Sequence, residues 1–215
     1  MELKRLTFYL DFISPYAYLA FERLPQALEG ISHAVSYQPV LFASMLKAHG
    51  NLGPAELQPK REWTYRHVLW LAQAQGTPMQ MPEVHPFNPL ALLRLALACS
   101  ADGQPSRWVC ETIFRHVWAQ GGDPNDAQRL ARLSEQLKPA LDPAGEPVKQ
   151  RLKVASEQAI AAGVFGVPTV AVGDKLFWGL DALPMLRDHL EGGAWFVGPA
   201  WDLASAVPVG IERRR

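Results

Sequence analysis

The stretch that decides the fold is TFYLDFISPYAYLA, residues 7–20. Its first half is apolar at nearly every position, which is typical of a strand covered on both faces. A Ser14-Pro15 pair follows, and the next apolar residues recur at helical spacing. We therefore expect a strand over 4–12 and a helix over about 15–28. A second strand over 33–40 completes a strand–helix–strand unit, and such crossovers are right-handed.

The sequence changes character after residue 42. Helical patterns follow, separated by loops rich in glycine and proline, at residues 43–49, 60–75, 89–101, 105–120, 126–137 and 146–162. Strand patterns return in TVAV and KLFW, which a turn at Gly173-Asp174 joins as a hairpin. A last helix is expected over 181–191, and a loop-like tail from Gly192.

This order of elements predicts an α/β protein with a thioredoxin-like sheet and a large all-helical insertion after the second strand. We expect a discontinuous thioredoxin-like domain over 1–42 and 163–205, a helical insertion subdomain over 43–162, and a tail over 206–215. With 215 residues, 48% of them hydrophobic, the chain is long enough for one sizeable core with an insertion.

Composition excludes several classes of partner. Lys and Arg together number 21, as do Asp and Glu, so the formal net charge is zero. A nucleic-acid binder would need a basic patch, which is absent. No run of 18 apolar residues predicts a membrane span, and the N-terminus lacks the layout of a signal peptide. We expect a cytoplasmic protein with no nucleic-acid and no membrane partner.

The two cysteines, Cys99 and Cys110, form no C-x-x-C pair and have no histidine at zinc-site spacing. Both fall within helical patterns, where a buried reduced thiol behaves as a small hydrophobic group. We expect neither a disulfide bond nor a metal site. The protein's own thiols are thereby removed as candidates for the chemistry.

Ser14-Pro15-Tyr16-Ala17 stands where thioredoxin-like folds carry a C-x-x-C pair. Both thiols are absent, so disulfide exchange by the protein itself is excluded. What remains is a helix N-terminus with free N–H groups, the positive end of the helix dipole and a hydroxyl donor. A thiolate held there must come from a ligand. The alternative is that Ser14 is a plain N-cap before proline.

Two later motifs favour the ligand. Val167-Pro168 begins a strand, where a cis-proline would turn the preceding backbone outwards to pair with an extended peptide. A trans proline on an edge strand is the alternative. Asp181 opens the last helix, either as its N-cap or as an acceptor for an ammonium group. Together these features fit a short thiol peptide with an amino terminus, and glutathione is the obvious one.

The stretches DFISPYAYLA, GNLGP, VFGVPT and FWGLD resemble the 2-hydroxychromene-2-carboxylate isomerases and the related kappa-class glutathione transferases. The resemblance implies a DsbA-like thioredoxin fold, bound glutathione and a homodimer. It implies that Ser14 holds the glutathione sulfur, that Val167 supplies the backbone pairing to the cysteinyl part beside Pro168, and that Asn51 lies near the substrate and the sulfur. The γ-glutamyl end is expected at Trp178, Gly179, Leu180 and Asp181.

A pocket for an aromatic carboxylate needs a cation and aromatic walls. The candidates in the insertion and its loops are Lys47, Arg61, Trp63, His67, His85 and Asn88. Each also has an ordinary structural explanation, as a solvated charge, a helix-face residue or a cap. As a group they predict where the substrate lies.

The function implied is a glutathione-dependent isomerase in aromatic-compound catabolism. The thiolate would add to the conjugated bond of a chromene carboxylate or its ring-opened enone, rotation would follow, and elimination would regenerate glutathione. One alternative is a kappa-like transferase or peroxidase, in which the thiol is consumed. Another is a glutathione- or peptide-binding module without turnover.

Overall fold

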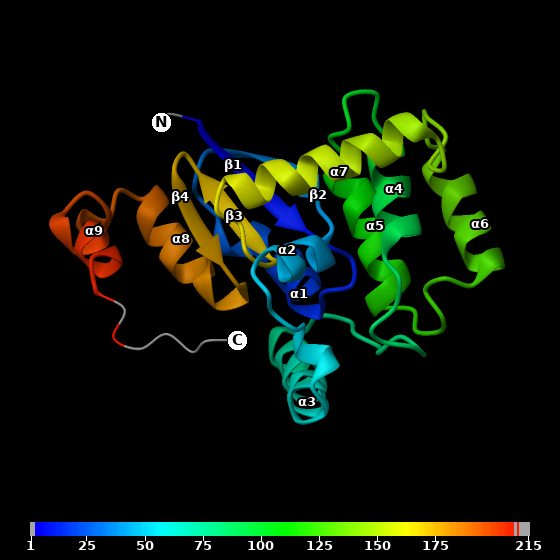
Figure 1. Cartoon of the computed structure of the whole chain (residues 1–215), viewed down its shortest axis with the longest axis horizontal. Helices are drawn as coiled ribbons and strands as arrows, with labels where there is room; N and C mark the ends of the chain where they lie inside the picture. Colours follow the sequence, from blue (N-terminus) through cyan, green and yellow to red (C-terminus); the bar gives the residue numbers. More distant parts are fainter. Residues whose placement is uncertain (1–2, 209, 211–215) are drawn as a thin grey trace.

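The computed structural model describes residues 3–208 and 210. These residues form one sheet of four strands in the order β2-β1-β3-β4 (Figure 1). β1 (Lys4–Leu10) pairs in parallel with β2 (His33–Pro39) and antiparallel with β3 (Thr169–Val172). β3 in turn pairs antiparallel with β4 (Lys175–Trp178). The expected strand–helix–strand unit, the hairpin and the thioredoxin-like class are confirmed.

All six helices expected between the second and third strands are present, with ends shifted by up to three residues. They are α2 (Phe42–Ala48), α3 (Gln58–Gln75), α4 (Leu90–Ala98), α5 (Arg107–Trp118), α6 (Ala127–Leu137) and α7 (Glu146–Ala161). The helix after β1 is α1 (Pro15–Ala27), and the helix after β4 is α8 (Leu183–Leu190). No helix among the described residues has both the length and the apolar character needed to cross a membrane.

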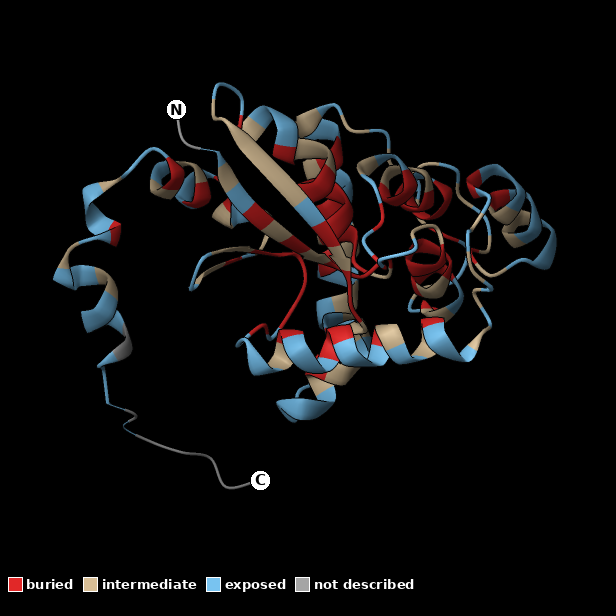
Figure 2. Ribbon diagram, turned by 90° about the horizontal axis from the view of Figure 1, so that it is seen from above, coloured by how far each residue is buried: buried red, intermediate tan, exposed pale blue. Residues whose placement is uncertain are grey.

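The two faces of the sheet bury different side chains because successive strand residues point to opposite faces. Phe8 and Leu10 of β1 join the core cluster that also contains Phe21 of α1 and Leu186 of α8. Tyr9, between them, packs into a second cluster with Val40, Met45, Ala159 and Val167. Figure 2 shows the buried residues gathered in the strands and the helices that cover them.

Helix α7 joins the sheet to the other helices, because it contacts β2 as well as α2 and α4 (Figure 1). The hydroxyl of Ser156 on α7 accepts a hydrogen bond of 2.9 Å from the Leu41 amide, just before α2. The boundaries of the insertion subdomain at 43–162 stay a prediction. Of the predicted tail over 206–215, residues 209 and 211–215 lie outside the described residues.

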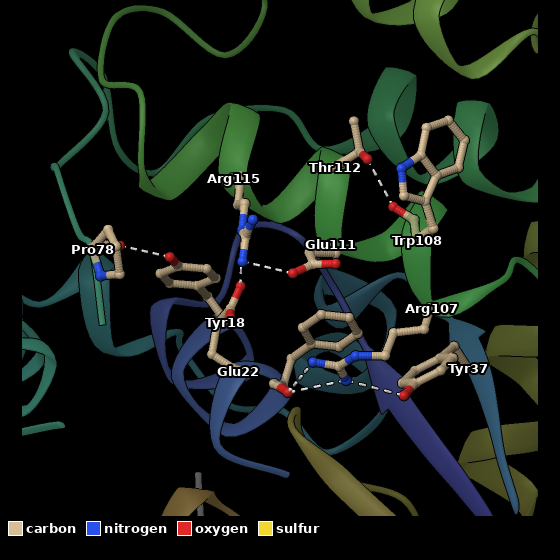
Figure 3. Close-up of polar contacts among 10 residues, drawn as sticks. Tyr18, Glu22, Tyr37, Pro78, Arg107, Trp108, Glu111, Thr112 and Arg115 are labelled. Atoms are coloured by element: carbon tan, nitrogen blue, oxygen red, sulfur yellow. Dashed lines mark hydrogen bonds and ion pairs between the residues drawn. The ribbon is translucent and has the colours of Figure 1, made fainter. Parts of the chain in front are cut away.

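Arg107 anchors α5 to α1 and β2 (Figure 3). Its Nη1 donates to the Tyr37 hydroxyl at 3.1 Å, and its Nη2 donates to the Phe21 carbonyl at 3.2 Å. The guanidinium also lies 4.1 Å from the centroid of the Phe21 ring, a cation–π arrangement. These contacts fix the middle of α1 and thereby help to position its N-terminus, which Ser14 precedes.

The expectation of a loop-like tail from Gly192 is wrong. A 3₁₀ turn, η3 (Ala194–Phe196), and a helix, α9 (Pro199–Ser205), follow α8. Pro199 stands in the first turn of α9, a position that suits it. Phe196 and Trp201 pack against Phe177 of β4, with ring centroids 6.0 and 6.3 Å away. These tertiary contacts, which local patterning does not reveal, explain the additional helix.

Candidate active site

Ser14 is the N-cap of α1, the alternative that the sequence left open. Its backbone is extended, with φ −91° and ψ 114°, and its Oγ accepts a hydrogen bond of 3.2 Å from the Ala17 amide. Pro15 occupies the first helical turn, where a missing N–H costs nothing. Ser14 is 8% exposed. The hydroxyl oxygen is therefore committed to the helix, while its hydrogen remains free to point elsewhere.

The hydrogen of Ser14 has one neighbour in the structure, the carbonyl oxygen of Val167, at 3.4 Å from Oγ. That distance is longer than the range of about 2.5–3.0 Å typical of a hydroxyl donor, so a better acceptor would displace the carbonyl. The Val167-Pro168 peptide bond is cis, which confirms that prediction. The start of β3 thus faces the N-terminus of α1.

The turn that carries Ser14 is built on Asp11, which the sequence analysis did not single out. Asp11 is completely buried, and its carboxylate accepts hydrogen bonds from the amides of Ile13 (3.1 Å) and Phe42 (2.9 Å). Burial raises the pKa of Asp11 to about 7, against the lowering effect of the two amides. A charged residue at the end of an apolar strand was the available signal.

Asp181 does not cap the last helix, so that interpretation is wrong. It lies in a 3₁₀ turn, η2 (Leu180–Ala182), and α8 begins afterwards with Ala182 as its N-cap and no side-chain cap bond. Asp181 is exposed, and its carboxylate makes no hydrogen bond or ion pair with another described residue. The chain therefore presents an unpaired carboxylate at the start of α8.

Gly179 allows this arrangement. Its φ is +101°, and a Cβ built at this position would lie 2.4 Å from Oδ1 of Asp181. Any larger residue would collide with the carboxylate as well as strain the backbone. The amide of Gly179 donates to the Pro168 carbonyl at 2.9 Å, which ties the FWGLD segment to the cis-proline.

A groove of about 780 Å³ runs between α1, α3 and α8. Six of the residues predicted to hold glutathione line it, and so does one predicted substrate residue, His67. The lining residues named by the sequence analysis are His67, Val167, Pro168, Trp178, Gly179, Leu180 and Asp181. Ser14 does not line the groove but lies against Val167, which does. Strand ends and helix starts that are distant in sequence thus meet in one concave surface.

The groove also contains a Tyr–His pair that sequence reasoning missed. The Tyr16 hydroxyl lies 2.8 Å from Nδ1 of His67, and both residues line the groove. Burial, with a smaller effect from the Asp181 charge, raises the pKa of Tyr16 above its usual value. Tyr16 therefore stays protonated and keeps a hydrogen to donate.

His67 is held between two indoles on α3. Trp63 and Trp70 stack on its ring, with centroids 5.9 and 6.4 Å away and interplanar angles of 14° and 11°. Both tryptophans are about two-thirds exposed. This face of α3 offers flat aromatic surface beside the groove.

The groove also contains an unsatisfied amide oxygen. Gln75 lines the groove, and its Oε1 is buried without any hydrogen-bond partner. Arg23 and Arg187 line the groove as well, from α1 and α8. A buried acceptor without a donor is costly, so a ligand that brings an N–H group to Gln75 would relieve that cost.

The other predicted substrate residues lie outside the groove. Both ring nitrogens of His85 are hydrogen-bonded within the protein. Its Nε2 donates to the Ile13 carbonyl at 2.9 Å, and its Nδ1 lies 2.8 Å from the Tyr65 hydroxyl. Asn88 Oδ1 accepts from the Leu90 amide at 3.1 Å, but the N-cap of α4 is Pro89 and not Asn88 as expected, because the helix begins one residue later, at Leu90. Lys47 is near the end of α2, and Arg61 is on α3. Asn51, in the GNLGP loop, also does not line it.

Neither cysteine is bridged, which confirms that prediction. Burial raises the pKa of Cys99 to about 11 and that of Cys110 still further. Both thiols therefore stay protonated near neutral pH, and neither lines the groove. No group of three or more His, Cys, Asp or Glu within residues 3–208 and 210 could hold a metal ion.

The comparisons with known proteins agree with this geometry. The family model of the DSBA-like thioredoxin domain matches residues 5–191. A 2-hydroxychromene-2-carboxylate isomerase of Sphingobium xenophagum is 30% identical over 87% of this chain and 98% of its own. Glutathione S-transferase kappa 1 of Rattus norvegicus is 26% identical over 90% of this chain and 93% of its own.

A solved 2-hydroxychromene-2-carboxylate isomerase superposes with a TM-score of 0.77 at 27% identity, covering 93% of this chain and 98% of that one. The family model, the sequence relatives and the structural superposition therefore point to the same family. The chain belongs to the DSBA-like thioredoxin domain family and, within it, to the family of the 2-hydroxychromene-2-carboxylate isomerases.

Proposed function

We propose that this protein is a glutathione-dependent isomerase of aromatic carboxylates of the 2-hydroxychromene-2-carboxylate type, acting as a cytoplasmic homodimer in aromatic-compound catabolism. The observation that carries the proposal is the approach of the Ser14 hydroxyl to the Val167 carbonyl at a groove that contains no cysteine of its own. The match covers 98% of the length of each of these two relatives, and their names support the reaction class.

Glutathione would bind with its sulfur at Ser14. The Ser14 hydroxyl would donate its hydrogen bond to the thiolate instead of to the Val167 carbonyl, and the N-terminal amides and dipole of α1 would stabilise the negative charge. The cysteinyl backbone would pair with Val167, next to Pro168. The ammonium group of the γ-glutamyl end would bind the unpaired carboxylate of Asp181, beside Trp178 and the backbone of Gly179 and Leu180.

The nucleophile of the proposed reaction is the thiolate of bound glutathione, and no side chain of the protein has to attack the substrate. The sulfur would form a bond to the carbon at the end of the conjugated C=C of the ring-opened substrate, and the π electrons would move to the carbonyl oxygen. The bond that was double is now single and rotates. Return of the electrons from oxygen breaks the C–S bond and releases the thiolate, so no thiol is consumed.

Tyr16 is placed to stabilise the oxygen that becomes negative in this addition. It remains protonated, lines the groove two residues beyond Ser14, and is oriented by His67. A hydrogen bond from Tyr16 to the enolate oxygen strengthens as the charge develops. The stacked rings of Trp63, His67 and Trp70 would then contact the aromatic part of the substrate.

The kappa-class relative supports a second candidate, a transferase or peroxidase that consumes glutathione at the same site. The two functions differ in thiol balance. Purified protein is incubated with glutathione and a chromene carboxylate, while absorbance follows isomerisation and titration of free thiols follows glutathione. Turnover at constant thiol supports the isomerase, and stoichiometric thiol loss supports the transferase. Binding of glutathione without either reaction would identify a binding module.

The same assay tests whether the chain's own thiols take part. Cys99→Ala and Cys110→Ala should retain both glutathione-dependent turnover and the fold, because neither thiol lines the groove. Turnover that persists without added glutathione, or that disappears in a folded cysteine variant, would contradict the borrowed-thiol mechanism.

A further inference from the structure

A second hollow, of about 400 Å³, lies between α2, α4 and α7. It shares no lining residue with the groove at Ser14 and Asp181. Its polar wall is formed by Ser44 of α2, Arg94 of α4, and Lys149, Lys153, Ser156 and Glu157 of α7. None of these residues has a place in the proposed isomerase mechanism.

Arg94 is the residue that distinguishes this hollow. Its Nε is buried and has no hydrogen-bond partner. Within residues 3–208 and 210, its guanidinium makes no ion pair either. The Nε–H of this cationic side chain is therefore left without an acceptor. Buried donors almost always have partners, and an exception calls for an explanation.

The charges around Arg94 do not compensate it. Lys149 lies 3.7 Å from Glu146, and Lys153 lies 3.9 Å from Glu157. These pairs are near the upper limit of ion-pair distance, and all four side chains are at least 42% exposed, so solvent weakens both pairs. Glu157 is the one acid among the lining residues, against three cations. The hollow therefore carries excess positive charge.

We propose that this hollow binds a small oxyanion, a carboxylate or a phosphate group, through Arg94. The guanidinium presents donors in a planar fork that matches two oxygens of such a group. Lys149 and Lys153 supply further positive charge at the rim, and the Ser44 hydroxyl supplies a further hydrogen-bond donor. The volume suits a small molecule. The proposal does not depend on the isomerase function.

Calorimetric titration of the full chain tests this proposal, with sodium phosphate and sodium acetate as separate probes at constant ionic strength. Each titration is repeated with saturating glutathione. Wild type should bind at least one probe saturably, with unchanged affinity in glutathione. Arg94→Met keeps the apolar stem and should weaken binding at least tenfold. The matched control, Arg132→Met on α6, changes an exposed arginine outside the hollow and should leave the affinity unchanged.

The preferred probe distinguishes a phosphate site from a carboxylate site. If Arg94→Met does not fold, as judged by circular dichroism, the double variant Lys149→Gln/Lys153→Gln decides, because both lysines are substantially exposed. It should weaken binding severalfold. Absence of saturable binding of both probes to wild type overturns the proposal, as does equal affinity in wild type and the folded hollow variants.

Discussion

The hydroxyl oxygen of Ser14 lies 3.4 Å from the carbonyl oxygen of Val167, although 153 residues separate them in the chain. The antiparallel pairing of β1 with β3 brings them together, because Tyr9 near the end of β1 pairs with Thr169 at the start of β3. One strand ends where the other begins. Ser14 and Val167 are therefore positioned by the sheet itself, and four of the predictions below depend on that position or on its neighbours.

Replacing Ser14 by alanine tests whether the hydroxyl stabilises a thiolate. Loss of one hydrogen bond to an anion should cost about 1.5–3 kcal/mol, or about tenfold to a hundredfold in rate. The thiol pKa of bound glutathione should rise, because the α1 amides alone stabilise the thiolate less well. Thiolate absorbance against pH, with the protein saturated with glutathione, measures the change.

Ser106→Ala is the matched control for this experiment. Ser106 caps α5 in the same way, with its Oγ 3.3 Å from the Val109 amide, and it lies outside the groove. Both variants should lose about 1 kcal/mol of folding stability from the lost cap. Only Ser14→Ala should shift the thiol titration. Superimposable titration curves would leave Ser14 with the role of a cap.

Asp181→Asn should weaken glutathione binding about tenfold to a hundredfold, through loss of a charged hydrogen bond to the ligand's ammonium group. Folding stability should change little, since Asp181 is exposed and makes no cap bond in the structure. Titration calorimetry with glutathione measures the affinity. Asp188→Asn, an exposed acid later in α8 and outside the groove, serves as the control. Equal affinities in the two variants would exclude Asp181 from the site.

Tyr16→Phe should lower kcat about tenfold to a hundredfold and leave glutathione affinity unchanged, because the hydroxyl is proposed to bind only the enolate oxygen. Tyr65→Phe removes a second Tyr–His hydrogen bond of 2.8 Å, to His85, outside the groove. It therefore controls for loss of the bond as such. Steady-state kinetics in both substrates separates kcat from KM. A Tyr16→Phe enzyme with wild-type kcat would remove the hydroxyl from the mechanism.

Asp11 should make stability depend on pH. Its pKa is raised to about 7 in the folded protein, mainly by burial, so the folded state holds a proton that the unfolded state releases near pH 4. This stabilising contribution is complete below pH 4 and is lost as pH rises towards 7. Urea unfolding between pH 4 and pH 8 should show the loss in wild type. In Asp11→Asn this component of the pH dependence should be absent, whereas parallel profiles would contradict the assignment.

The elements of the sheet and the capped start of α1 were predictable because their signals are local. An apolar run, a Ser-Pro pair and a turn at Gly173-Asp174 each act over a few residues. α9 was missed because its packing partner, Phe177, lies more than twenty residues earlier. The capping role expected for Asp181 failed because an intervening 3₁₀ turn moved the start of α8 to Leu183.

The groove was only partly predictable for a similar reason. Val167 and Asp181 belong to short motifs with a recognisable pattern. The contact of Tyr16 with His67 joins residues 51 positions apart on two helices, and no periodicity in either helix predicts it. Gln75 was not predictable either, since a single glutamine near a helix end has no distinctive spacing. Sequence patterns therefore indicated the strand-derived part of the site better than the α3 side.

The two walls of the groove therefore differ in how they can be changed. The wall made by α1, the Val167-Pro168 segment before β3 and the start of α8 is positioned by backbone pairing, so changes to its backbone would disturb the sheet. The wall made by α3 consists of side chains on an exposed helix face, Trp63 and Trp70 among them. Substitutions on that face of α3 should change which aromatic compound is accepted and leave the proposed glutathione site unaltered. The substrate specificity of such a protein can therefore be varied through α3 alone.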